Sequence, residues 1–81
     1  MRRWSESEYE LLFRNHPPTD RHAPTATECA GIGSSIGRTA GAIASQWDDG
    51  RSLVLGQRNA ASAGLAAWLS LRGWLGDSIT H

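Results

Sequence analysis

The stretch Ile32–Trp47, IGSSIGRTAGAIASQW, carries the information that decides the fold. Two clusters of small and apolar residues flank a central Gly-Arg-Thr tripeptide. Gly37 is suited to end a helix in the left-handed conformation, and Thr39 is suited to cap the start of the next helix. The pattern therefore predicts two helices, over residues 25–35 and 39–48, that are joined by a tight turn.

The second of these helices has two different faces. At about 100° per residue, one face collects apolar side chains and ends in tryptophan: Ala40, Ile43, Ala44 and Trp47. The opposite face carries small and polar residues: Gly41, Ala42 and Ser45, with Gln46 at its edge. Since a tryptophan face is normally buried, we expect the small polar face to point outward.

Two further helices are expected on either side of this pair. A helix over residues 5–15 is indicated by Ser5, which stands at capping-box spacing from Glu8. An apolar helix is expected over residues 60–73, with large side chains around much of its circumference. Such a helix must be buried on more than one side, and a second copy of the chain is a natural way to cover it. The segment between residue 50 and this helix is ambiguous, because Leu53–Leu55 suits either an extended strand or a turn.

Length and composition limit the classes of protein to consider. A chain of 81 residues forms one small domain at most. Its net charge is zero, which argues against a protein that coats DNA by charge alone. No apolar run is long enough to cross a bilayer, and the first residues lack the apolar core of a signal peptide. We therefore expect a cytoplasmic, nucleoid-associated protein with no membrane contact.

The chain from Trp4 to Trp47 resembles a Myb/SANT-type helix-turn-helix domain. The resemblance is carried by WSESEYELL at its start and by IGRTAGAIASQW at its end. Trp4 and Trp47 match the first and third core tryptophans of the family, and Cys29 stands in the place of the second. The resemblance implies an all-α fold, in which residues 1–50 form a three-helix Myb-like bundle. Residues 51–81 then form a C-terminal extension, whose apolar helix packs on the bundle or mediates dimerisation.

The resemblance also implies that the helix over residues 39–48 enters the major groove of DNA. Carried over position by position, the contact residues are Arg38, Thr39, Ala42, Ser45 and Gln46. The side chains on this face have suitable chemistry, since the amide of glutamine pairs with adenine edges. Arg2 and Arg3 are expected to form a short arm toward a minor groove or phosphates. Arg51 reaches the DNA backbone if the segment after the helix turns back.

These observations predict a sequence-preferring DNA-binding protein without catalytic activity or cofactor. We expect a small transcriptional or recombination regulator, of bacterial or phage and mobile-element type, that binds double-stranded DNA as a homodimer. The C-terminal helix is expected to form the dimer contact. One alternative is a protein-interaction module of the SANT type, because no basic residue lies between Thr39 and Trp47 and two acids follow. The other is a non-catalytic accessory domain of a DNA-processing enzyme.

Other chemistries have weaker signals in the sequence. The set His16, Asp20, His22 and Cys29 has the spacing of no standard zinc finger, so no metal site is expected. The segment GIGSSIG lacks both the GxGxxG spacing and the lysine of phosphate-binding loops, so no small-molecule substrate is expected. Cys29 is the single cysteine, and we interpret it as a small buried hydrophobic residue instead of a redox switch.

Overall fold

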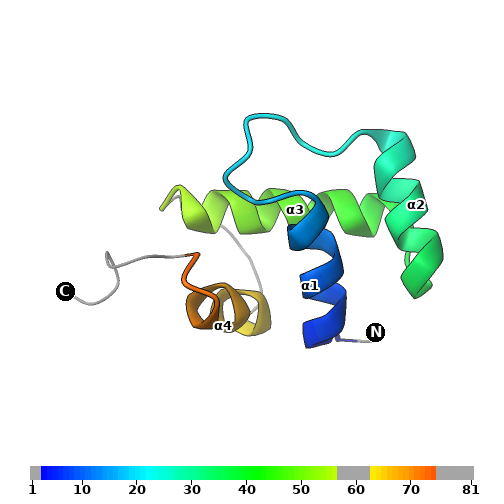
Figure 1. Cartoon of the computed structure of the whole chain (residues 1–81). Coiled ribbons are helices and arrows are strands. Elements are labelled where there is room, and N and C mark those ends of the chain that lie inside the picture. Colours follow the sequence, from blue (N-terminus) through cyan, green and yellow to red (C-terminus); the bar gives the residue numbers. More distant parts are fainter. Residues whose placement is uncertain (1–2, 57–62, 75–81) are drawn as a thin grey trace.

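The computed structural model describes residues 3–56 and 63–74, and these residues form four α-helices and no strand. The helices are α1 (Glu6–Asn15), α2 (Ala26–Ile36), α3 (Ala40–Val54) and α4 (Ala63–Leu71). The predicted all-α class is therefore confirmed. Helix α3 is the longest, α1 and α2 cross it, and α4 lies on the same side of α3 as α1 (Figure 1). Within the described residues, no helix is long and apolar enough to cross a membrane.

Helices α1 and α2 both begin with a capping box. The Ser5 hydroxyl accepts a hydrogen bond from the Glu8 N–H at 3.3 Å, and the Glu8 carboxylate accepts one from the Ser5 N–H at 2.8 Å. Thr25 and Glu28 repeat the arrangement at the start of α2, at 3.2 and 2.8 Å. Both starts agree with the sequence prediction, because the partners of a capping box lie only three residues apart.

The turn between α2 and α3 is tight and is tied to α2. Gly37 ends α2 with φ at 72°, in the left-handed region, as the sequence predicts. The Arg38 N–H donates to the Gly33 carbonyl at 2.8 Å, and a Cβ atom at Gly33 would overlap with the Arg38 carbonyl oxygen. The Thr39 hydroxyl then accepts from the Ala42 N–H at 3.1 Å and caps α3. Glycine at position 33 therefore lets the turn fold back onto α2, which fixes the direction of α3.

Helix α3 is longer than the sequence predicts. The expected end near Asp48 is wrong, because the helix continues to Val54. Gly50 is buried, and a Cβ atom there would lie 2.6 Å from the Phe13 ring. Glycine at position 50 thus permits close packing of α3 against α1 and does not end the helix. The boundary drawn between residues 1–50 and 51–81 falls inside α3.

All four helices contribute to one core. Its buried residues are Tyr9, Leu12, Phe13, Cys29, Ile43, Trp47, Leu65, Trp68 and Leu69. Aromatic rings meet where α1 contacts α4: the ring centroids of Phe13 and Trp68 are 5.6 Å apart, and so are those of Tyr9 and Trp68. Large rings bury much apolar area per residue, which a chain of this length needs to remain folded.

Helix α4 buries most of its large apolar residues within the chain. Leu65 and Leu69 are fully buried and Trp68 is 5% exposed, whereas Leu71 is 83% exposed. Trp74, which follows the helix, is partly buried against the core. Contacts with the rest of the chain therefore bury three of the large apolar side chains of α4, and Leu71 stays exposed. Dimerisation through this helix stays a prediction.

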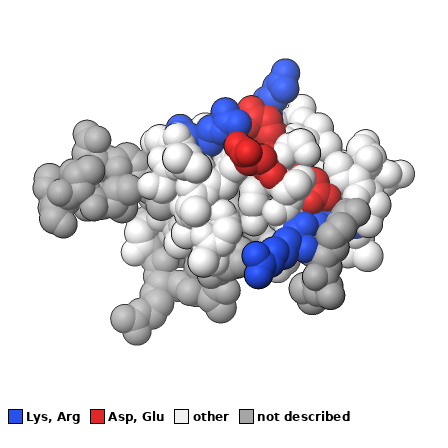
Figure 2. All heavy atoms as spheres, turned by 90° about the horizontal axis from the view of Figure 1, so that it is seen from below, with Lys and Arg blue, Asp and Glu red and all other residues white. Residues whose placement is uncertain are grey.

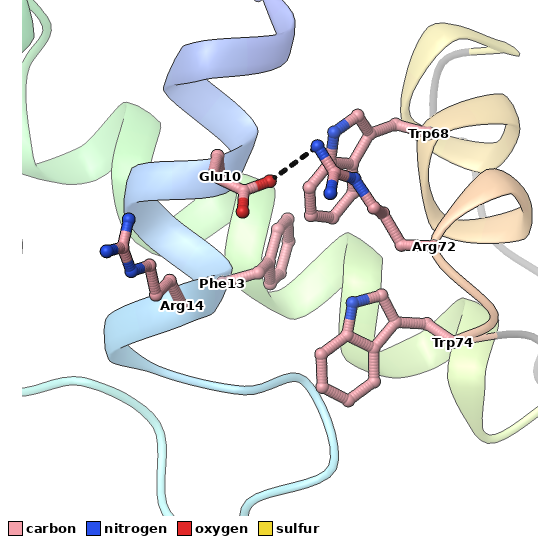
Figure 3. Close-up of a pocket in the computed structure, with 6 residues that line it drawn as sticks. All are labelled: Glu10, Phe13, Arg14, Trp68, Arg72 and Trp74. Carbon is pink, nitrogen blue, oxygen red and sulfur yellow. Dashed lines mark ion pairs between the residues drawn. The ribbon is translucent and has the colours of Figure 1, made fainter.

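An ion pair joins the residue that follows α4 to α1, beside a small pocket. Figure 3 shows Glu10 of α1 pointing toward Arg72, and their side chains are 2.9 Å apart. Phe13, Trp68 and Trp74 line the same pocket, whose volume is about 280 Å³. Small-molecule sites usually occupy about 300–1,000 Å³, so this space lies just below their range.

Candidate nucleic-acid interface

The candidate surface is the side of α3 that faces away from the core. Ile43 and Trp47 are 0% and 2% exposed, so they hold one side of α3 inside the protein. On the outer side, Thr39, Gly41 and Ser45 are exposed. Ala42 and Gln46 are half-buried at its edge. The first half of α3 therefore presents small, uncharged side chains to the outside.

Trp47 fixes the rotation of α3 about its own axis. Its indole Nε1 donates a hydrogen bond to the His16 carbonyl at 2.9 Å, in the segment that follows α1. A rotation of α3 breaks this bond and exposes the ring. The outward position of Ser45, two residues earlier, therefore follows from the inward position of Trp47.

Arg38 is turned away from this surface and bound inside the protein. Its Nε and Nη2 atoms donate to the two carboxylate oxygens of Glu8 at 3.1 and 3.0 Å, and both side chains are only 11% exposed. Its guanidinium carbon lies 4.6 Å from the centroid of the Trp4 ring. The charge of Arg38 is matched by Glu8, so this ion pair joins α1 to the turn before α3. The DNA contact that the sequence suggests for Arg38 stays a prediction.

Arg51 lies on a different side of α3 from the small polar face. It is half-buried, and its guanidinium carbon lies 5.5 Å from the centroid of the Trp47 ring. Arg51 follows Gln46 by five residues, which places the two about 140° apart around the helix axis. The structure therefore does not bring Arg51 and Gln46 together on one surface.

The N-terminal arm is described in part. Arg2 lies outside the described residues, and the Arg3 side chain is exposed. The Arg3 carbonyl accepts a hydrogen bond from Nη2 of Arg38 at 2.9 Å. The arm is thus attached to the residue that directly precedes the Thr39 cap of α3.

Acidic residues border the second half of the candidate surface. Asp48 is exposed, three residues after Ser45, and therefore lies on the same outer stripe of α3. Asp49 is half-buried; burial raises the pKa of its carboxyl group, and the neighbouring charge of Asp48 raises it further. On the underside of the molecule, acidic and basic side chains lie next to each other and most of the face is uncharged (Figure 2).

Cys29 is placed as the sequence predicts, inside the core. It is 2% exposed, and its thiol donates to the Pro24 carbonyl at 3.8 Å. Burial raises the pKa of the thiol, and the charges of Glu28 and Asp48 raise it further. A raised pKa keeps the thiol protonated and unreactive. Within the described ranges, no three His, Cys, Asp or Glu side chains gather in a way that suits a metal ion.

Glu8 is the residue that sequence reasoning missed. Its spacing from Ser5 identifies it as part of a capping box, and the structure confirms that contact. The same carboxylate also binds Arg38, thirty residues later. A local pattern has no signal for such a distant partner.

Comparison of the chain with family models, curated proteins and solved structures found no match.

Proposed function

We propose that the chain is a small DNA-binding protein of the helix-turn-helix type, in which α1, α2 and α3 form a Myb-like unit. The observation that carries this proposal is the orientation of α3: Trp47 points into the core while Ser45 is exposed. A helix with a small, uncovered polar face suits the major groove, whose width admits a helix. The resemblance of residues 4–47 to Myb/SANT domains supports the same use of α3.

The base contacts in this proposal come from Ala42, Ser45 and Gln46. Serine bonds to several base edges, glutamine pairs with adenine, and the alanine methyl group packs on thymine. The Gln46 Oε1 atom is buried and has no hydrogen-bond partner within the described residues. When the Gln46 amide rotates toward DNA, this oxygen therefore loses no hydrogen bond within the protein.

Phosphate contacts in this proposal come from the arm and from the start of α3. Arg3, together with Arg2 before it, supplies the positive charge, and the exposed Thr39 hydroxyl and the first N–H groups of α3 approach a phosphate. These contacts are few, so one copy binds weakly. We propose that two copies bind as a homodimer through the α4 side, which places two recognition helices about 34 Å apart or at a multiple of that distance. Such a protein acts as a transcriptional or recombination regulator of the phage or mobile-element type.

A second candidate function is a protein-interaction module, as in other SANT-type domains. It is favoured by the outer stripe of α3, which carries the exposed Asp48 and no exposed arginine. A partner protein with a basic surface suits this stripe, whereas DNA phosphates are repelled by its acid.

The two functions are separated by a salt-titrated binding assay on DNA selected from random sequences. DNA binding predicts that the logarithm of the binding constant falls linearly with the logarithm of salt concentration, because phosphate contacts release counterions. Replacement of Ser45 and Gln46 together by Ala is expected to remove the preference for selected over random DNA while the protein stays folded. Ser34→Ala, on an exposed position of α2, is the control and leaves the preference unchanged. Absence of binding, or an affinity that does not change with salt, favours the protein-interaction function.

A further inference from the structure

One arginine joins two parts of the chain that are far apart in sequence. Arg38 stands in the turn before α3, and it contacts Arg3, Trp4 and Glu8 at the start of the chain. These contacts use both the nitrogen atoms and the flat face of the guanidinium group. Nε and Nη2 bind the carboxylate of Glu8, Nη2 also binds the carbonyl of Arg3, and the group lies over the ring of Trp4.

These contacts require the shape of a guanidinium group as well as its charge. Its planar fork matches a carboxylate and stacks on an aromatic ring at the same time, which a lysine ammonium group cannot do. The Trp4 ring also stacks on the Tyr9 ring, with ring centroids 5.5 Å apart, so it has a second contact that holds it in place. Arg38 therefore fixes the backbone of residues 3–4 on the α2–α3 turn.

We propose that Arg38 is a positioning residue for the N-terminal arm and does not itself touch DNA. It holds the Arg3–Trp4 backbone against the turn, so that the Arg3 side chain leaves the protein near the start of α3 and contacts a DNA phosphate there. This inference rests on the proposed DNA-binding function. Arg3 is exposed, and in the described part of the chain its side chain makes no ion pair, so its charge is available to a phosphate.

The first test measures the order of the arm without DNA. In Arg38→Lys, the heteronuclear NOE of the Trp4 indole N–H is expected to fall. The Trp47 indole N–H, which is bonded to His16 in the core, is the internal control and keeps its value. An unchanged NOE at Trp4 overturns the proposal.

The second test measures DNA binding in a double-mutant cycle. Arg3→Ala and Arg38→Lys are each expected to lower the salt slope by about one, the value of one lost phosphate contact. In the combined variant, the slope falls no further, because Arg38 acts through Arg3. Additive losses show that Arg38 has its own phosphate contact, and they overturn the proposal.

A third variant tests the same contact from the side of Glu8, so that the proposal can still be decided if Arg38→Lys does not fold. Glu8→Gln keeps an acceptor for the Ser5 N–H but removes the charge that holds Arg38, and it is expected to lower the NOE of the Trp4 indole as Arg38→Lys does. Failure of the wild-type chain to bind any DNA overturns the proposed function and the phosphate contact together. In that case the NOE still decides whether Arg38 orders the arm, so the two failures are distinguishable.

Discussion

Gly50 of α3 lies directly against the Phe13 ring of α1, and a Cβ atom at position 50 would lie 2.6 Å from Cζ of that ring. Phe13 is 1% exposed and its ring also stacks on Trp68 of α4, so a shift of the ring away from position 50 disturbs this stacking. The contact explains why a glycine stands in the middle of a helix, where it normally costs about 1 kcal/mol relative to alanine. Close packing of α1 and α3 is what this glycine provides.

Gly50→Ala is therefore expected to destabilise the protein, although alanine is the better helix former. Overpacking of a core costs about 1–3 kcal/mol, which exceeds the gain in helix propensity. Gly41→Ala in the same helix is the control, because its Cβ atom meets nothing closer than the Thr39 hydroxyl at 4.0 Å. Gly41→Ala is expected to raise the free energy of unfolding by up to about 1 kcal/mol. Urea denaturation measures both, and equal effects at the two positions contradict the packing role of Gly50.

The same glycine shows which parts of the fold follow from local sequence. The starts of α1 and α2 are predictable because Ser5 and Thr25 meet their partners within three residues. The end of α3 is not predictable, because glycine is common at helix ends and the meaning of Gly50 depends on a ring in another helix.

Arg38 shows the same limit for the candidate site. Its position just before α3 suggests a DNA contact. Within the protein, however, its side chain contacts Glu8 and Trp4, which stand at least 30 positions earlier in the chain. The outward position of Ser45 is predictable, since the periodicity of a helix places it opposite a buried face. Local periodicity thus gives the direction of a side chain, whereas the partner of a charged group depends on the tertiary fold.

Trp47 is expected to be the most sensitive position of the core. Trp47→Ala removes a buried ring and is expected to cost about 3–5 kcal/mol in the free energy of unfolding. Trp47→Phe retains most of the ring but loses the hydrogen bond to the His16 carbonyl, so a smaller loss is expected, of which about 0.5–1.5 kcal/mol comes from the bond. Thermal melting followed by circular dichroism measures both variants. Near wild-type melting of Trp47→Ala contradicts the position of this ring in the core.

Cys29 is expected to react slowly with iodoacetamide in the folded protein. The thiolate is the reactive form, and burial raises the pKa of this thiol, so the fraction of thiolate at neutral pH is lower than in a free cysteine. The rate of labelling should rise with pH only above the range in which an exposed cysteine reacts. Labelling in denaturant is the control and should proceed at the ordinary rate. Rapid labelling of the folded protein at neutral pH contradicts the buried position.

Asp48 is expected to weaken DNA binding if α3 enters the groove as proposed. It is exposed on the same stripe as Ser45, so its charge faces the phosphates that flank the groove. Asp48→Asn removes this repulsion without changing the size of the side chain, and it is expected to raise the affinity for DNA severalfold at low salt. The increase should shrink as salt concentration rises, because salt screens exposed charges.

Asp20→Asn is the matched control, because Asp20 is also exposed but lies in the connection between α1 and α2. Both variants change the net charge of the chain by the same amount, so only a position near the phosphates makes Asp48 more effective than Asp20. Titration of each variant with the selected DNA by fluorescence anisotropy measures the difference. Equal affinities for the two variants mean that the effect comes from net charge alone, and that the outer stripe of α3 does not face DNA.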